Sequence, residues 1–124
     1  NAPTVRPRHV MGIEAPRVLF KTAASRLSAE EWPDTITAIH PETVSVLEDE
    51  GACLIGTDAP SVDPLDSTEL SAHHALIEAG IVNLEGLSLA EVDPGSYSLM
   101  SLPVKFQGGD AAPVRAVLGD ASLF

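Results

Sequence analysis

The chain has 124 residues, 44% of them hydrophobic, and carries a net charge of −11 from 18 acidic and 7 basic side chains. This length suits a single domain, in which folding buries roughly two-thirds of the surface of the unfolded chain. The negative charge argues against nucleic acid and anionic membranes as partners, because both would repel the protein.

The sequence shows no pattern of a membrane-spanning segment or of a signal peptide, and both observations bear on where in the cell we expect the protein. No stretch approaches the roughly 20 apolar residues of a membrane-spanning helix, and the N-terminal segment lacks the apolar core of a signal peptide. The single cysteine, Cys53, cannot form an internal disulfide and lies in the apolar run ACLIG, where we expect a buried thiol. These features predict a soluble protein in the reducing cytoplasm.

The first half of the chain predicts two buried strands and one helix. Residues 1–15 contain two prolines and predict a loop or an arm. The apolar runs 16–22 and 52–57 predict strands. Residues 23–38 are expected to be mostly irregular, whereas 41–50 predict a helix, with proline in its first turn and a glycine just beyond its end.

The second half predicts one helix and three strands. After an acidic loop with two prolines, Asp66 and Glu69 resemble a capping box that opens a helix over Ser67–Ala79. Strands are predicted at 81–85, 97–106 and 113–118. Alternating strands and helices favour parallel pairing, while the last two strands could be antiparallel or form a second sheet. The predicted class is therefore α/β, a mixed sheet with packed helices.

Two adjacent histidines lie on the second predicted helix. Leu70, His73, His74 and Ile77 follow the i, i+3, i+4, i+7 spacing, which predicts that both imidazoles lie on or beside an apolar face. An inward histidine is more often a hydrogen-bonded core residue than a metal ligand.

Glu85 changes this balance, because the run IVNLEGLSL places a carboxylate inside a predicted buried strand. An unpaired buried carboxylate is costly, and a cation shared with His73 would satisfy both groups. Imidazole and carboxylate are good ligands for zinc and manganese. The alternative is a glutamate at the end of a strand that faces water.

The loop before the helix carries Asp58, Ser61 and Asp63. It follows a predicted parallel strand, where open sheets usually place functional groups. Acids and serine are also suited to forming turns and capping helices. We expect these residues to shape the loop or to support metal ligands, and not to bind the metal themselves.

The chain lacks the motifs of several other enzyme classes. It has no Gly-rich phosphate loop, GxSxG elbow, CxxC pair or HExxH helix, which argues against nucleotide-binding, serine-hydrolase and zincin sites. A catalytic zinc usually takes three protein ligands and a water, so His73 and Glu85 alone are an incomplete set.

At these residues the chain resembles the bacterial kynurenine formamidases, of the metal-dependent cyclase-like hydrolase family. The resemblance covers most of the chain, through PRVLFKT, PETVSVL, GTDAPSVDP, STELSAHHAL, NLEGLSL, PGSYSLMSLPVKF and DAAPVRAVL. It implies an α/β fold of the family's own type, usually dimeric, with a divalent metal, commonly zinc. It also implies that His73 and Glu85 are metal ligands. His74 matches a neighbouring histidine of the family, and we group it with the supporting residues.

The family's upstream ligand motif, HxGTHxDxP, and a nearby histidine thought to move protons do not occur in this sequence. Residues 1–124 are thus similar to the C-terminal half of one such domain, with the catalytic acid/base and further ligands expected in the N-terminal half. The resemblance implies hydrolysis of N-formyl-L-kynurenine to L-kynurenine and formate in tryptophan breakdown, by a homodimer of the complete protein. Alternatives are a related hydrolase, such as an isatin hydrolase, and a metal-free interaction module.

Overall fold

The computed structural model describes residues 3–123 of the chain. The chain divides into two compact units, one ending at Glu91 and the other beginning at Val92. The first unit contains the parallel strands and both α-helices, and the second is an antiparallel ribbon. The predicted α/β class is confirmed.

A three-stranded parallel sheet organises the first unit. Its strands are β2 (Arg17–Phe20), β4 (Leu54–Thr57) and β5 (Val82–Leu84), in the order β2-β4-β5. Each strand lies within a run that the apolar pattern predicted. Because β4 is central and its residues are buried on both faces, its sequence is a continuous apolar run with no polar alternation.

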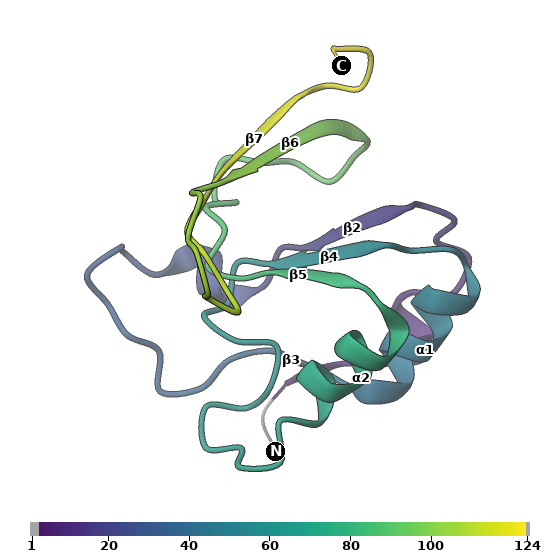
Figure 1. The fold of residues 1–124 in the computed structure, drawn as a ribbon, viewed down its shortest axis with the longest axis vertical. Coiled ribbons are helices and arrows are strands. Elements are labelled where there is room, and N and C mark those ends of the chain that lie inside the picture. The colour runs from purple at the N-terminus through teal and green to yellow at the C-terminus, as the bar shows by residue number, and fades with distance from the viewer. Residues whose placement is uncertain (1–2, 124) are drawn as a thin grey trace. The chain divides into compact units, whose positions relative to one another are not determined.

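Helices α1 (Pro41–Asp49) and α2 (Ser71–Ala79) lie on the same side of this sheet (Figure 1). A buried cluster joins them to the strands; it includes Val18, Ile55, Val44, Leu47 and Leu76. No helix within residues 3–123 is both long enough and apolar enough to cross a membrane.

The N-terminal segment is more structured than a loop or an arm. It includes the short strand β1 (Thr4–Val5), which pairs in parallel with β3 (Ala38–Ile39), and the 3-10 helix η1 (Pro7–His9). Val10 is fully buried in the core cluster. Two-residue strands carry no periodic signal, and β1 depends on a partner more than thirty residues away. The otherwise irregular segment 23–38 also begins with a 3-10 helix, η2 (Ala23–Arg26).

Helix α2 begins four residues later than predicted. Leu70, immediately before it, has a left-handed backbone with φ of 48°, so the helix cannot extend through it. The predicted capping box of Asp66 and Glu69 is therefore wrong. The amide groups of the first turn are bound by a carboxylate from farther upstream, as described below.

The predicted apolar face of α2 is also wrong. Ile77 is 75% exposed and Leu70 42%, whereas Ala72 and Leu76 are buried. The face that packs against the core consists of Ala72, Ala75, Leu76 and Ala79, which have the same i, i+3, i+4, i+7 spacing displaced by two residues. Two overlapping helical patterns fit the sequence, and the one rich in alanine packs against the core because small side chains allow close approach to α1.

Cys53 is exposed, contrary to the prediction of a buried thiol. It lies just before β4, and its Sγ donates a hydrogen bond to the carbonyl of Pro16 at 3.1 Å. The apolar run that suggested burial starts at Ala52, two residues before the strand itself begins at Leu54.

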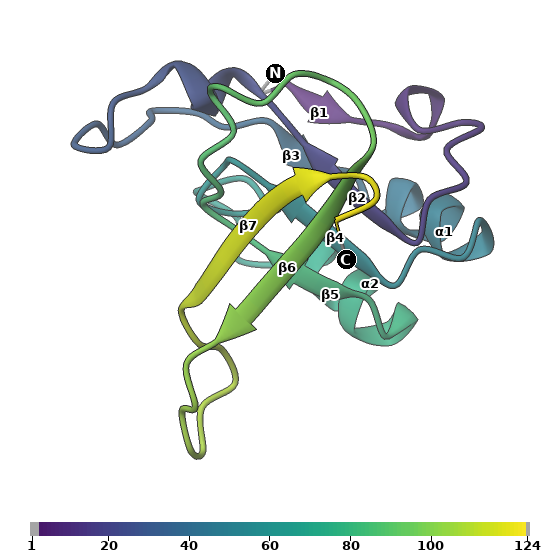
Figure 2. The same cartoon turned by 90° about the horizontal axis from the view of Figure 1, so that it is seen from above.

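The second unit consists of β6 (Tyr97–Pro103) and β7 (Val114–Asp120), paired antiparallel as Figure 2 shows. The pair forms a sheet separate from the other strands, so both expectations for the last two strands are confirmed. Its described side chains are half-buried or exposed, among them Met100, Leu102 and Val117.

The packing of α2 can be tested at two neighbouring positions. Leu76 is 2% exposed and Ile77 75%. We expect Leu76→Ala to lower the free energy of unfolding by about 2–5 kcal/mol, because it leaves a cavity in the core. Ile77→Ala on the same helix should change it by no more than about 0.5 kcal/mol. Urea denaturation followed by circular dichroism measures both, and equal losses would contradict this assignment of the buried face.

Candidate metal centre

Two acidic residues follow the ends of neighbouring parallel strands. Asp58 comes directly after β4, and Glu85 directly after β5. Because β4 and β5 pair in parallel, with Gly56 opposite Leu84, these acids lie at the same edge of the sheet. This is the edge at which open α/β sheets bind ligands.

The loop after β4 also determines where α2 begins. The carboxylate of Asp63 accepts hydrogen bonds from the backbone amides of Ala72 at 2.8 Å and His73 at 3.0 Å. These amides have no partner within the helix, and Leu70 has no side-chain oxygen to cap them. Ser61 in turn accepts a hydrogen bond from the Asp63 amide through its Oγ at 3.1 Å. Asp63 therefore caps the helix from outside it.

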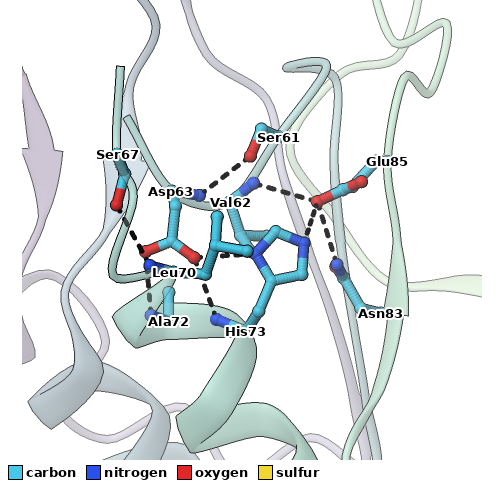
Figure 3. Close-up of polar contacts among 9 residues, drawn as sticks. All are labelled: Ser61, Val62, Asp63, Ser67, Leu70, Ala72, His73, Asn83 and Glu85. Atoms are coloured by element: carbon cyan, nitrogen blue, oxygen red, sulfur yellow. Dashed lines mark hydrogen bonds and ion pairs between the residues drawn. The ribbon is translucent and has the colours of Figure 1, made fainter. Parts of the chain in front are cut away.

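The imidazole ring of His73 lies between two carboxylates (Figure 3). Its Nδ1 is 2.7 Å from Oδ2 of Asp63, and its Nε2 is 3.2 Å from Oε1 of Glu85. The Asp63 side chain is 4% exposed, and those of His73 and Glu85 are about one-third exposed. The structure thus brings together the two residues that the sequence proposed as ligands, and adds Asp63 on the far side of the ring.

Glu85 does not lie inside a buried strand, as the sequence suggested. It follows the last residue of β5, and its carboxylate is partly open to solvent. Its Oε1 accepts hydrogen bonds from the Val62 amide and from Nδ2 of Asn83, each at 3.0 Å. The cost of an unpaired buried carboxylate, from which the pairing with His73 was inferred, therefore does not apply.

The charge state of Asp63 determines where His73 carries its proton. Burial raises the pKa of Asp63, but hydrogen bonds from the Ala72 amide and from the ring and amide of His73, with the charge of His73, outweigh it and lower the pKa. An ionised carboxylate only accepts hydrogen bonds, so the proton between the two groups belongs to Nδ1. In the neutral ring Nε2 then presents a lone pair to the Glu85 carboxylate.

Two acceptors that face each other at 3.2 Å need a cation between or beside them, either a second ring proton or a metal ion. Ligands at the usual 2.0–2.1 Å from zinc lie roughly 2.9–3.4 Å apart when the angle at the ion is between 90° and tetrahedral. The observed separation falls in this interval, so the pair fits a shared divalent ion. Within residues 3–123 no group of three or more His, Cys, Asp or Glu side chains is arranged to hold a metal.

Two of the other predicted site residues, Asp58 and His74, do not share the hydrogen bonds that join Asp63, His73 and Glu85. The Asp58 carboxylate accepts hydrogen bonds from the amides and hydroxyls of Thr22 and Ser25, which hold the start of η2. Asp58 is 8% exposed and makes these contacts in place of any with His73. His74 is exposed.

The sequence did not point to Asn83 or to the Val62 amide. A backbone amide has no residue signature, and an asparagine two residues before an acid has many explanations. Oδ1 of Asn83 is buried and has no hydrogen-bond partner within the described residues. Its amide group is therefore oriented by the Glu85 carboxylate alone.

A cavity of about 350 Å³ lies near the same edge of the sheet. Its wall includes Asp58 and Pro60 after β4, Gly86 next to Glu85, and Trp32 and Ser28 from the segment after η2. This volume falls at the lower end of the roughly 300–1,000 Å³ found for small-molecule sites.

Comparison with known proteins finds similar sequences and similar solved structures. No protein-family profile matches the chain. It is 60% identical over 124 residues to the kynurenine formamidase of Salinibacter ruber (strain DSM 13855 / M31), an alignment that covers 98% of this chain and 58% of that protein. The resemblance drawn from the motifs is confirmed, and the chain spans rather more than half the length of this relative.

Two solved structures have the same fold. A potential metal-dependent hydrolase with cyclase activity matches with a TM-score of 0.81 at 26% identity, over 95% of this chain and 59% of that one. A predicted metal-dependent hydrolase from Bacillus stearothermophilus matches with a TM-score of 0.79 at 27% identity, over 93% and 56%.

The lowered pKa of Asp63 makes its contribution to stability depend on pH. A carboxyl group with a lowered folded-state pKa stabilises the fold above its ordinary pKa of about 4, and this is lost as the pH falls through the folded-state value. We expect Asp63→Asn to reduce the unfolding free energy by about 1–3 kcal/mol at pH 7, since the amide NH2 must face a backbone N–H of α2.

The difference between the wild type and Asp63→Asn should shrink as the pH falls from about 4 toward the lowered folded-state pKa of Asp63, below which the folded wild-type carboxyl is also neutral. Thermal unfolding between about pH 3 and pH 7 measures it. A constant difference over this range would contradict the ionised state of Asp63.

Proposed function

We propose that this chain, which is similar to metal-dependent cyclase-like hydrolases over part of their length, contributes His73 and Glu85 to a divalent-metal centre that hydrolyses N-formyl-L-kynurenine to L-kynurenine and formate in tryptophan breakdown. The observation that carries the proposal is the approach of Nε2 of His73 to Oε1 of Glu85 at 3.2 Å, with Nδ1 already bound to Asp63. The 60% identity to a kynurenine formamidase supports the choice of reaction.

In this proposal each residue of the chain has a distinct task. His73 and Glu85 offer lone pairs to one side of a zinc or manganese ion, and Asp63 keeps the His73 proton on Nδ1. A divalent ion held there would supply Lewis acidity toward the formyl carbonyl and lower the pKa of a bound water. The acidic surface of the protein, with a net charge of −11, favours binding of a cation.

The remaining parts of the site are proposed to come from protein outside these 124 residues. The relatives are longer than this chain, and two ligands fall short of the three that a catalytic zinc usually takes. The group that delivers a proton to the leaving aniline nitrogen belongs to the same missing part. A cytoplasmic homodimer of the complete protein completes the proposal.

A second hydrolase reaction is supported by one of the structural relatives, described as having cyclase activity. Enzymes that open or close a cyclic amide, such as an isatin hydrolase, could use the same metal chemistry with a different pocket. Turnover of N-formylkynurenine and of isatin by the complete protein separates the two reactions. A ratio of kcat/KM that favours isatin would replace the proposed substrate.

The metal site can be tested on the chain itself. We expect the wild-type chain to bind Zn²⁺ weakly, and His73→Ala or Glu85→Ala to reduce the affinity by tenfold or more, since loss of a supporting group alone costs about 10- to 100-fold. His74→Ala is the matched control, because His74 is exposed and adjacent, and it should leave the affinity unchanged. Isothermal titration calorimetry measures all four proteins. Equal affinities would exclude this pair as ligands.

The chain alone should not hydrolyse N-formylkynurenine, because its described residues contain no group of three or more side chains arranged to hold a metal, and because the proposal assigns the acid/base group to protein outside this chain. Appreciable formamidase activity of the purified 124-residue chain, measured by formation of kynurenine, would overturn the division of the site that we propose.

A further inference from the structure

We infer that the dipeptide Val62–Asp63 is a clamp that positions both His73 and Glu85, and that Asp63 acts in it as a positioning residue that fixes the His73 proton on Nδ1 and leaves Nε2 facing Glu85. The part of this inference that concerns a cation rests on the proposed function. The positioning of the ring and its proton does not.

The first support is that one carboxylate oxygen binds His73 twice. Oδ2 of Asp63 accepts from the His73 amide at 3.0 Å and lies 2.7 Å from its Nδ1. These contacts hold the backbone and the far part of the same side chain against one atom. The ring therefore cannot change rotamer without losing a charge-assisted hydrogen bond in a place where Asp63 is only 3% exposed.

The second support is that the neighbouring residue binds Glu85. The Val62 amide donates to Oε1 of Glu85 at 3.0 Å, and that same oxygen is the one 3.2 Å from Nε2 of His73. Two consecutive residues thus orient the two side chains, one through a backbone N–H and the other through a carboxylate. The separation between Nε2 and Oε1 is therefore set by the conformation of this short segment.

The third support is that the clamp is itself fixed on several sides. The Val62 side chain is fully buried in the core cluster, and its carbonyl accepts from the Ile39 amide of β3 at 2.8 Å. The Asp63 amide donates to Oγ of Ser61 at 3.1 Å. Residues that position a site must themselves be held by packing and hydrogen bonds, and these contacts hold both Val62 and Asp63.

A carboxylate that only capped the helix would not need to contact the ring. Asp58 provides this comparison within the same chain, because it is similarly buried and binds amides and hydroxyls at the start of η2. Its partners do not include the His73 ring. Loss of Asp58 should therefore disturb local structure and leave the His73 tautomer intact, whereas loss of Asp63 should change both.

The test reads the tautomer directly. Long-range 1H–15N NMR of the metal-free chain at mildly alkaline pH, where imidazoles are neutral, should show His73 with a protonated Nδ1 and an unprotonated Nε2. Asp63→Ala and Asp63→Ser should shift the proton population toward Nε2. Asp63→Ser keeps an oxygen that can accept from the helix start, so it guards against a variant that simply fails to fold. Asp58→Ala should keep the wild-type tautomer.

Titration with Zn²⁺ supplies the second measurement. Asp63→Ser should weaken binding by about 10- to 100-fold, and Asp58→Ala should leave it unchanged. A neutral wild-type ring with its proton on Nε2 and none on Nδ1, or a tautomer unaffected by Asp63→Ser, overturns the inference. If the tautomer responds as expected but no protein binds Zn²⁺, the positioning role stands and the proposed metal centre fails.

Discussion

The buried carboxylate of Asp63 is the interaction on which the arrangement of the site depends. It joins the loop after β4, the first turn of α2 and the ring of His73 through three hydrogen bonds. The helix has no cap of its own, since Leu70 precedes it in a left-handed conformation. The Asp63 carboxylate therefore both caps the first turn of α2 and orients the imidazole ring of His73, so the ring is oriented whenever the helix forms.

The sequence predicted those elements whose signals are local. Strands β2, β4 and β5 lie within the short runs that the apolar pattern predicted, although only β4 is buried throughout, and α1 has a proline at its start and a glycine beyond its end. What could not be predicted depends on distant residues. β1 forms only against β3, and the start of α2 is set by an acid eight residues before Ser71 and not by the nearer capping-box pair. Within a short stretch of sequence, nothing shows that Asp63, and not Asp66 or Glu69, caps the helix.

In the candidate site, too, some features could be predicted from the sequence and others could not. The pairing of His73 with Glu85 follows from residue types and the resemblance to a known family, and the two side chains do converge. The pairing does not result from the burial of an unpaired carboxylate, because Glu85 is partly exposed and already bound by Val62 and Asn83. Asp63 was expected to shape the loop or support a ligand, but its contact with the ring could not be derived from spacing alone.

The hydrogen bonds that orient His73 and Glu85 bear on the proposed binding of a cation. In a flexible site, part of the binding free energy is spent on ordering side chains, at about 0.5–1.5 kcal/mol for each. Here hydrogen bonds to Asp63 and to the Val62 amide hold the His73 and Glu85 side chains in place, which lowers this cost for the cation binding that we propose. Two acceptors held 3.2 Å apart are unfavourable by themselves, so this ordering is maintained by the fold and favours a cation. In the proposed centre, the further ligands would join two side chains that the fold already holds in place.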